Sequence, residues 1–126
     1  MKTVVVLGAS DKPERMSNIA VLLLRKKGYR VISINPTIDT IGDIAVTHSL
    51  PEVPEEPDVL SMYVNPERSS IMEDDIIRLA PGTAIFNPGS ENDELEAKLT
   101  ENGIRVVRAC TVVLLKTDRF DAETNA

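Results

Sequence analysis

The stretch VVVLGASDKPERMSN, residues 4–18, decides the fold class. Four apolar residues, Val4–Leu7, run directly into Gly8, and a helical pattern begins near Ser17. An apolar strand that ends in glycine and leads into a helix is typical of the first turn of a nucleotide-binding α/β domain. However, Ser10 and Pro13 stand where the fingerprint G-x-G-x-x-G needs its second and third glycines. The stretch therefore predicts a ligand-binding turn of another kind.

Apolar runs bounded by turn residues recur along the chain. Together with 4–7 they predict strands at 30–34, 59–64, 83–86 and 104–107, and a shorter one at 44–47. Continuous apolar runs are typical of strands that are buried on both faces of a parallel sheet. The expected order across the sheet is 44–47, 30–34, 4–7, 59–64, 83–86 and 104–107.

Helical segments separate these strands. We expect Ser17 to cap the first helix, Asn65 to cap the second, and Ser90 or Asn92 to begin the third. This alternation predicts an α/β fold with a doubly wound parallel sheet. Ligands of such sheets bind beyond the carboxyl ends of the strands, where the strand order reverses. Four loops are expected to converge there, at 8–17, 35–37, 65–68 and 87–90.

The composition fits one domain over residues 1–126, with a flexible tail at 118–126. The net charge of −6 argues against a nucleic-acid partner, because phosphate backbones need clustered cations. No apolar run approaches the roughly 20 residues of a membrane span, so we expect a cytoplasmic protein. With Cys110 and His48 as the single residues of their kinds, no metal site is expected.

The first loop has the features of an anion site. Gly8 allows a tight turn, and Lys12 and Arg15 place two positive charges in an otherwise acidic chain. The backbone amides of Ala9 and Ser10, and those at the helix start, are candidate donors to an anion. The alternative is a solvated loop that only connects a strand to a helix.

A dinucleotide is the first ligand to consider for such a turn. The glycine fingerprint of NAD and NADP sites is incomplete, and the second strand ends in Asn35-Pro36, where an acidic ribose-binding residue is expected. The phosphate loop G-x-x-x-x-G-K-[ST] is also missing. An NAD(P)-linked oxidoreductase is therefore kept only as an alternative.

Three motifs resemble the small CoA-binding proteins related to the nucleotide-binding domain of the succinyl-CoA synthetase alpha subunit. The loop GASDKPERMS, residues 8–17, matches the pattern G-x-S-x-x-P-x-R-x-S that is common in that family. GYRVISINP, residues 28–36, resembles the family's second strand, and GDIAVTHSLPEVPEEPDVLSMYVNPE, residues 42–67, resembles the stretch that follows. The likeness covers about residues 3 to 112.

The resemblance implies a Rossmann-like domain that binds coenzyme A or an acyl-CoA. In that family the first loop meets the phosphates, and the two proline-containing turns flank the adenosine. The matching positions are Gly8, Ala9, Ser10, Arg15, Ser17, Asn35, Pro36, Tyr63, Val64 and Pro66. Lys12 joins them through its charge, since CoA carries several negative charges.

Two segments depart from the family pattern. Relatives often carry Trp-x-Gln-x-Gly after the fourth strand, and here Asn87 and Gly89 hold the last two of those positions and complete the expected binding set. After Cys110 a charged segment is replaced by the mostly apolar residues 111–115. This predicts a surface covered by a partner, such as a second copy of the chain in a homodimer.

The sequence assembles no nucleophile, base and orienting group; we expect His48 to have a structural or surface role and Cys110 to be a buried structural residue. The expected function is therefore binding of CoA or acyl-CoA without catalysis. The alternatives are the NAD(P)-linked oxidoreductase and a CoA-transferring enzyme subunit that depends on a partner.

Overall fold

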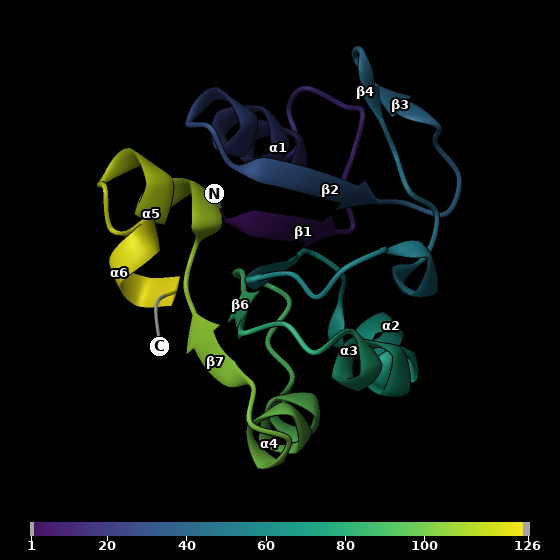
Figure 1. Cartoon of the computed structure of the whole chain (residues 1–126), viewed down its shortest axis with the longest axis vertical. Coiled ribbons are helices and arrows are strands. Elements are labelled where there is room, and N and C mark those ends of the chain that lie inside the picture. Colours follow the sequence, from purple (N-terminus) through teal and green to yellow (C-terminus); the bar gives the residue numbers. More distant parts are fainter. Residues whose placement is uncertain (1, 125–126) are drawn as a thin grey trace.

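The computed structural model describes residues 2–124, which form a five-stranded parallel sheet covered by helices on both faces (Figure 1). The strands are β1 (Thr3–Leu7), β2 (Arg30–Ile34), β5 (Val59–Met62), β6 (Thr83–Phe86) and β7 (Arg105–Arg108). Their order is β2-β1-β5-β6-β7, and every neighbouring pair is parallel. The α/β Rossmann-like fold and the order of these five strands are therefore confirmed.

Alternate residues of the strands build two cores, one on each face of the sheet, because successive side chains of a strand point in opposite directions. On one face Val5 and Leu7 pack with α3 (Glu73–Leu79) and α4 (Asp93–Glu101). On the other face Val4 and Val6 pack with α1 (Met16–Lys26), α5 (Thr111–Lys116) and α6 (Phe120–Thr124). Both cores consist mostly of Val, Ile and Leu.

The short strand expected at 44–47 is not the sixth strand of the main sheet, and this prediction was wrong. Ile44–Ala45 (β4) pairs antiparallel with Thr40–Ile41 (β3) in a separate hairpin. The two-residue turn between them contains Gly42 at φ +61°, a conformation that suits such hairpins. Only Thr47 bridges to the sheet, at Ile34 of β2.

The helix starts agree only in part with those expected. Asn65 caps α2 (Pro66–Ile71) by accepting a hydrogen bond from the Arg68 amide at 2.9 Å. Asn92 caps α4 in the same way. Ser17 does not cap α1, because the helix begins at Met16 with Arg15 in the cap position. Ser17 is buried in the first turn of α1 instead.

Within the flexible tail expected over 118–126, residues Phe120–Thr124 form α6, which packs against the core on one face of the sheet. Phe120 of α6 is buried and meets the Tyr29 ring edge-to-face, with 5.1 Å between ring centroids. The Lys2 ammonium donates a hydrogen bond to the Thr124 hydroxyl at 2.8 Å. Residues 125–126 of the expected tail lie outside the described residues.

The apolar segment 111–115 lies in α5 and does not form the apolar partner surface that was expected. Thr111, Val112, Leu114 and Leu115 are buried, and Val113 is half exposed. Their cover comes from the same chain, since α5 contacts α1 and α6 (Figure 1). The apolar run after the last strand is thus explained by α5, whose Leu114 and Leu115 pack in the same core as Val4 and Val6 of β1.

Candidate functional site

The loops that follow β1, β2 and β5 meet at the carboxyl edge of the sheet and enclose two adjoining hollows. The apolar hollow is lined by Leu7, Ile34, Pro36, His48, Ser49, Leu50, Val64, Met72 and Asp75. The basic hollow is lined by Ser10, Lys12, Glu14, Arg15, Met16 and Ser17. Gly8, Asn35, Tyr63 and Arg68 line both. Because they share these four residues, the hollows adjoin, and together they make up the candidate site at the point where the strand order reverses.

Gly8 is required here by the protein's own backbone. It has a φ of +91°, and a Cβ atom on it would lie 3.0 Å from Val64 Cγ1 and 3.2 Å from the Tyr63 carbonyl carbon. The amides of Gly8 and Ala9 both donate to the Ile34 carbonyl, at 3.1 and 3.0 Å. The Ala9 amide, expected as a donor to an anion, is thus used to join the turn to β2.

Three cations of the site lack a carboxylate partner. Most other Lys and Arg side chains form ion pairs, whereas Lys12, Arg15 and Arg68 form none within residues 2–124. The first-turn amides of α1 lie beside them, because the first hydrogen bonds at this helix end are those from Asn18 and Ile19 to the Arg15 carbonyl. Uncompensated positive charge next to a helix N-terminus attracts anions.

The shape of the basic hollow is held by polar contacts within its loop and to the neighbouring turn. The Ser10 hydroxyl accepts from the Lys12 amide at 3.1 Å, and the Ser10 carbonyl accepts from the Asn18 side chain at 2.9 Å. Asn35 Nδ2 donates to the Ala9 carbonyl at 2.7 Å, while its Oδ1 accepts from the Thr37 amide. Asn35 therefore joins the first loop to the turn after β2.

Tyr63 forms the wall between the site and the core. Its hydroxyl is buried beside Ser61 and Thr111 but makes no hydrogen bond within the described part of the chain. Ser61 and Thr111 are hydrogen-bonded to each other at 2.8 Å. Burial raises the pKa of Tyr63 to about 12, so this side chain is neutral throughout the physiological range.

A family model described as a CoA binding domain matches residues 2–116. The chain belongs to the CoA-binding domain family. Membership confirms the resemblance noted in the sequence and supports coenzyme A as the general class of ligand.

Similar proteins cover nearly the same length. The uncharacterized protein YneT of Bacillus subtilis (strain 168) is 26% identical over 106 residues, which is 84% of this chain and 78% of that protein. The crystal structure of an uncharacterized protein is 34% identical with a TM-score of 0.89, covering 95% of this chain and 98% of that one. Cell-free ID.343 from Thermus thermophilus is 31% identical with a TM-score of 0.87, covering 92% and 89%.

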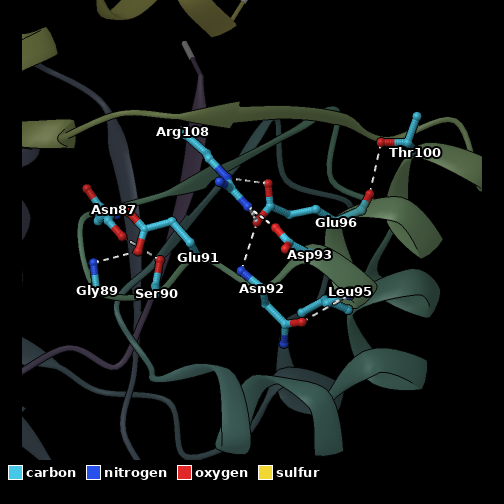
Figure 2. A network of polar contacts seen from close by, with 10 residues as sticks. All are labelled: Asn87, Gly89, Ser90, Glu91, Asn92, Asp93, Leu95, Glu96, Thr100 and Arg108. Atoms are coloured by element: carbon cyan, nitrogen blue, oxygen red, sulfur yellow. Dashed lines mark hydrogen bonds and ion pairs between the residues drawn. The ribbon is translucent and has the colours of Figure 1, made fainter.

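Four residues of the expected binding set line neither hollow: Ala9, which is fully buried, and Pro66, Asn87 and Gly89. Pro66 is exposed at the first position of α2, and its carbonyl accepts from Asn92. Asn87 is buried, with Nδ2 donating to the Met62 carbonyl at 2.9 Å. The Gly89 amide donates to the Glu91 carboxylate at 2.9 Å (Figure 2). The hydrogen bonds of Asn87 and Gly89 thus stabilise the loop that follows β6.

The expected binding set did not include Arg68, His48 or Met72, which line the site, although Arg68 lies in the loop 65–68 that was expected to converge there. Arg68 carried a usable signal, because it lies in the first turn of a helix that begins just after β5. His48 and Met72 carried none, since the irregular segment after β2 and the end of α2 approach the site only in the folded chain. His48 Nε2 lies 2.9 Å from Asp39 Oδ1. No cluster of His, Cys, Asp and Glu suited to a metal ion occurs within residues 2–124.

The two tyrosines predict an alkaline loss of stability. Burial, with the Asp121 carboxylate 2.6 Å from its hydroxyl, raises the pKa of Tyr29 to about 12, as burial does for Tyr63. The folded chain then keeps both phenolic protons to about pH 12, whereas the unfolded chain releases them near pH 10. The free energy of unfolding should therefore fall as the pH rises from 10 toward 12.

Ultraviolet absorbance of tyrosinate measures this directly. The native protein should titrate near pH 12 and the urea-unfolded protein near pH 10, and Tyr29→Phe should remove one of the two native transitions. Native transitions near pH 10 for both residues would show that neither phenol is shielded.

Within the described chain, no helix combines the length and the apolar character that a membrane crossing requires.

Proposed function

We propose that the chain binds coenzyme A or an acyl-CoA in the two adjoining hollows and performs no chemical step of its own. The observation that carries this proposal is the pairing of an apolar hollow with a basic one at the switch point of a CoA-binding domain. CoA has an adenine ring that suits an apolar slot and phosphates that suit unpaired cations.

The two hollows divide the ligand between them. The diphosphate occupies the basic hollow, where Lys12 and Arg15 supply charge and the first-turn amides at Met16 and Ser17 supply donors. The adenosine occupies the apolar hollow between Pro36 and the turn at Tyr63 and Val64. The backbone amides of Gly8 and Ala9 and the side-chain amide of Asn35 hold the two turns together.

The side chains at the site favour binding over catalysis. Cys110 is half buried and lines neither hollow. His48 is hydrogen-bonded to Asp39, an exposed carboxylate outside the hollows. The Asp39 carboxylate holds the His48 ring in place, and the Arg68 guanidinium is suited to bind an anion. We assign proton transfer to neither side chain.

Calorimetric titration with CoA, acetyl-CoA and NAD tests the proposal. CoA and acetyl-CoA should bind, and NAD should bind much more weakly. Asn35 at the end of β2 offers no carboxylate to a ribose, and its Oδ1 already accepts from the Thr37 and Ile38 amides. NAD binding as tight as that of CoA would overturn the proposal in favour of a nicotinamide-linked activity.

Arg15→Ala should weaken CoA binding roughly tenfold to a hundredfold, because it removes a charge-assisted contact of about 1.5–3 kcal/mol. The loss should shrink at high salt, since ions screen exposed charges. Lys26→Ala is the matched control, because Lys26, at the far end of α1, is also a cation without an ion pair within the described chain and lines neither hollow. Equal affinities for Arg15→Ala and Lys26→Ala would contradict the assignment of the basic hollow.

A further inference from the structure

We propose that Arg68 binds the 3′-phosphate of CoA and thereby makes the site prefer CoA to dephospho-CoA. This inference rests on the proposed function and adds a specificity-determining residue to it.

The position of Arg68 at the junction of the hollows is the first reason. It lines both hollows, together with Gly8, Asn35 and Tyr63. In CoA the ribose joins the adenine to the diphosphate, and it carries the 3′-phosphate. With the adenine in the apolar hollow and the diphosphate in the basic one, the ribose and its phosphate lie at the junction. Among the four junction residues, Arg68 supplies the cation.

The free charge of Arg68 is the second reason. Its side chain is exposed and pairs with no carboxylate within residues 2–124. Asp75, which lines the apolar hollow, is engaged by Arg78 at 3.4 Å. A phosphate monoester carries between one and two negative charges near neutral pH. The planar guanidinium fork can contact such a group through two parallel hydrogen bonds.

The rigid attachment of α2 is the third reason. The Arg68 amide is fixed by Asn65, and the far side of the helix is fixed by Asn92 at the start of α4. Asn92 Nδ2 lies within hydrogen-bond distance of the Pro66 carbonyl, the Ser69 hydroxyl and the Ser70 hydroxyl, at 3.1, 3.0 and 2.9 Å. The Asn92 amide in turn donates to Glu96, which Arg108 of β7 engages (Figure 2).

This chain of contacts ties α2 to α4 and α4 to the sheet. The backbone of Arg68 is therefore in place before a ligand arrives, which lowers the entropy cost of the contact.

The experiment measures CoA and dephospho-CoA on the parent chain, Arg68→Met and Arg15→Met. The parent should prefer CoA by roughly tenfold to a hundredfold, the range for a charge-assisted contact. Arg68→Met should lose that preference, with dephospho-CoA affinity unchanged within about threefold, which is well under 1.4 kcal/mol. Arg15→Met should weaken both ligands alike. Lys116→Met, which changes a cation that lines neither hollow, should change neither affinity.

The outcomes separate this inference from the proposed function. If the parent binds neither ligand, the proposed function is overturned. If CoA binds and Arg68→Met keeps the parent's preference, or weakens both ligands equally, the function stands and the assignment of Arg68 is overturned. Thermal unfolding of each variant checks that α2 remains folded, and Arg68→Lys should restore part of the preference because it keeps the charge.

Discussion

The Gly8→Ala variant is expected to lose about 2–5 kcal/mol of unfolding free energy, the sum of a backbone term and a packing term. The φ of +91° at Gly8 is strained for any residue with a Cβ atom. That Cβ would also meet Val64 Cγ1 at 3.0 Å and the Tyr63 carbonyl carbon and oxygen at 3.2 and 3.3 Å. The carbonyl belongs to the backbone that follows β5, so the contact cannot be relieved by a side-chain rotation alone. Urea denaturation at neutral pH measures the loss.

Gly28→Ala separates the two terms. Gly28 has nearly the same φ, +93°, but a Cβ atom there would meet nothing within 4 Å. It should therefore lose only the backbone term, about 1–2 kcal/mol. The excess loss in Gly8→Ala then measures how closely the first turn packs against β5. Equal losses in the two variants would show that the turn yields to the added methyl group, and that Gly8 matters through its φ alone.

Asn87→Ala is expected to lose about 2–4 kcal/mol of unfolding free energy, because it leaves buried polar groups without partners. Asn87 Oδ1 accepts from the Thr111 amide at 2.8 Å, and Nδ2 donates to the Ser61 hydroxyl at 3.0 Å and the Met62 carbonyl at 2.9 Å. Asn87 and Thr111 are buried, so water cannot replace the lost side chain without entering the core. These contacts join β5, β6 and the start of α5.

Asn102→Ala is the control for this prediction. Its side chain makes one exposed hydrogen bond to the Lys98 carbonyl at the end of α4, and its loss should change stability by less than about 0.5 kcal/mol. CoA titration below the melting temperature then distinguishes support of the fold from contact with the ligand. Asn87→Ala should bind CoA as the parent does. If the Asn87→Ala protein is folded but no longer binds CoA, Asn87 contacts the ligand, as the sequence predicted.

Local patterns were sufficient for the main sheet. Each strand of the main sheet follows an apolar run, and Gly8 ends β1 where expected, whereas β5 ends at Met62, two residues before the bound expected at Val64. Asn65 and Asn92 cap helices because a short side chain with an acceptor oxygen satisfies a first-turn amide wherever a helix begins. Such interactions reach only three residues along the chain, so they can be read without knowing what packs nearby.

The same local reasoning failed where distant segments compete for one residue. The Ala9 amide suited an anion by its position after Gly8, but Ile34 of β2 accepts its hydrogen bond. Asn87 stands where the family pattern often has glutamine, and here it is buried and hydrogen-bonded to β5 and α5. Residues 111–115 have the apolar character of a partner surface, but α1 and α6 of the same chain cover them.

By itself, then, the sequence determined the fold class, the order of the main strands, the family, and the loop that carries Lys12 and Arg15. The fold class, the family and the loop follow from periodicity, turn residues and motifs that are local along the chain, and the strand order follows from the doubly wound pattern that the alternation of strands and helices implies. The tertiary structure decided which backbone amides remain free and which polar side chains are buried. It also decided that Arg68 reaches the same hollow as Arg15, more than fifty residues away. The physical reason is that hydrogen-bond partners, burial and unpaired charge depend on segments brought together only when parallel strands align their carboxyl ends.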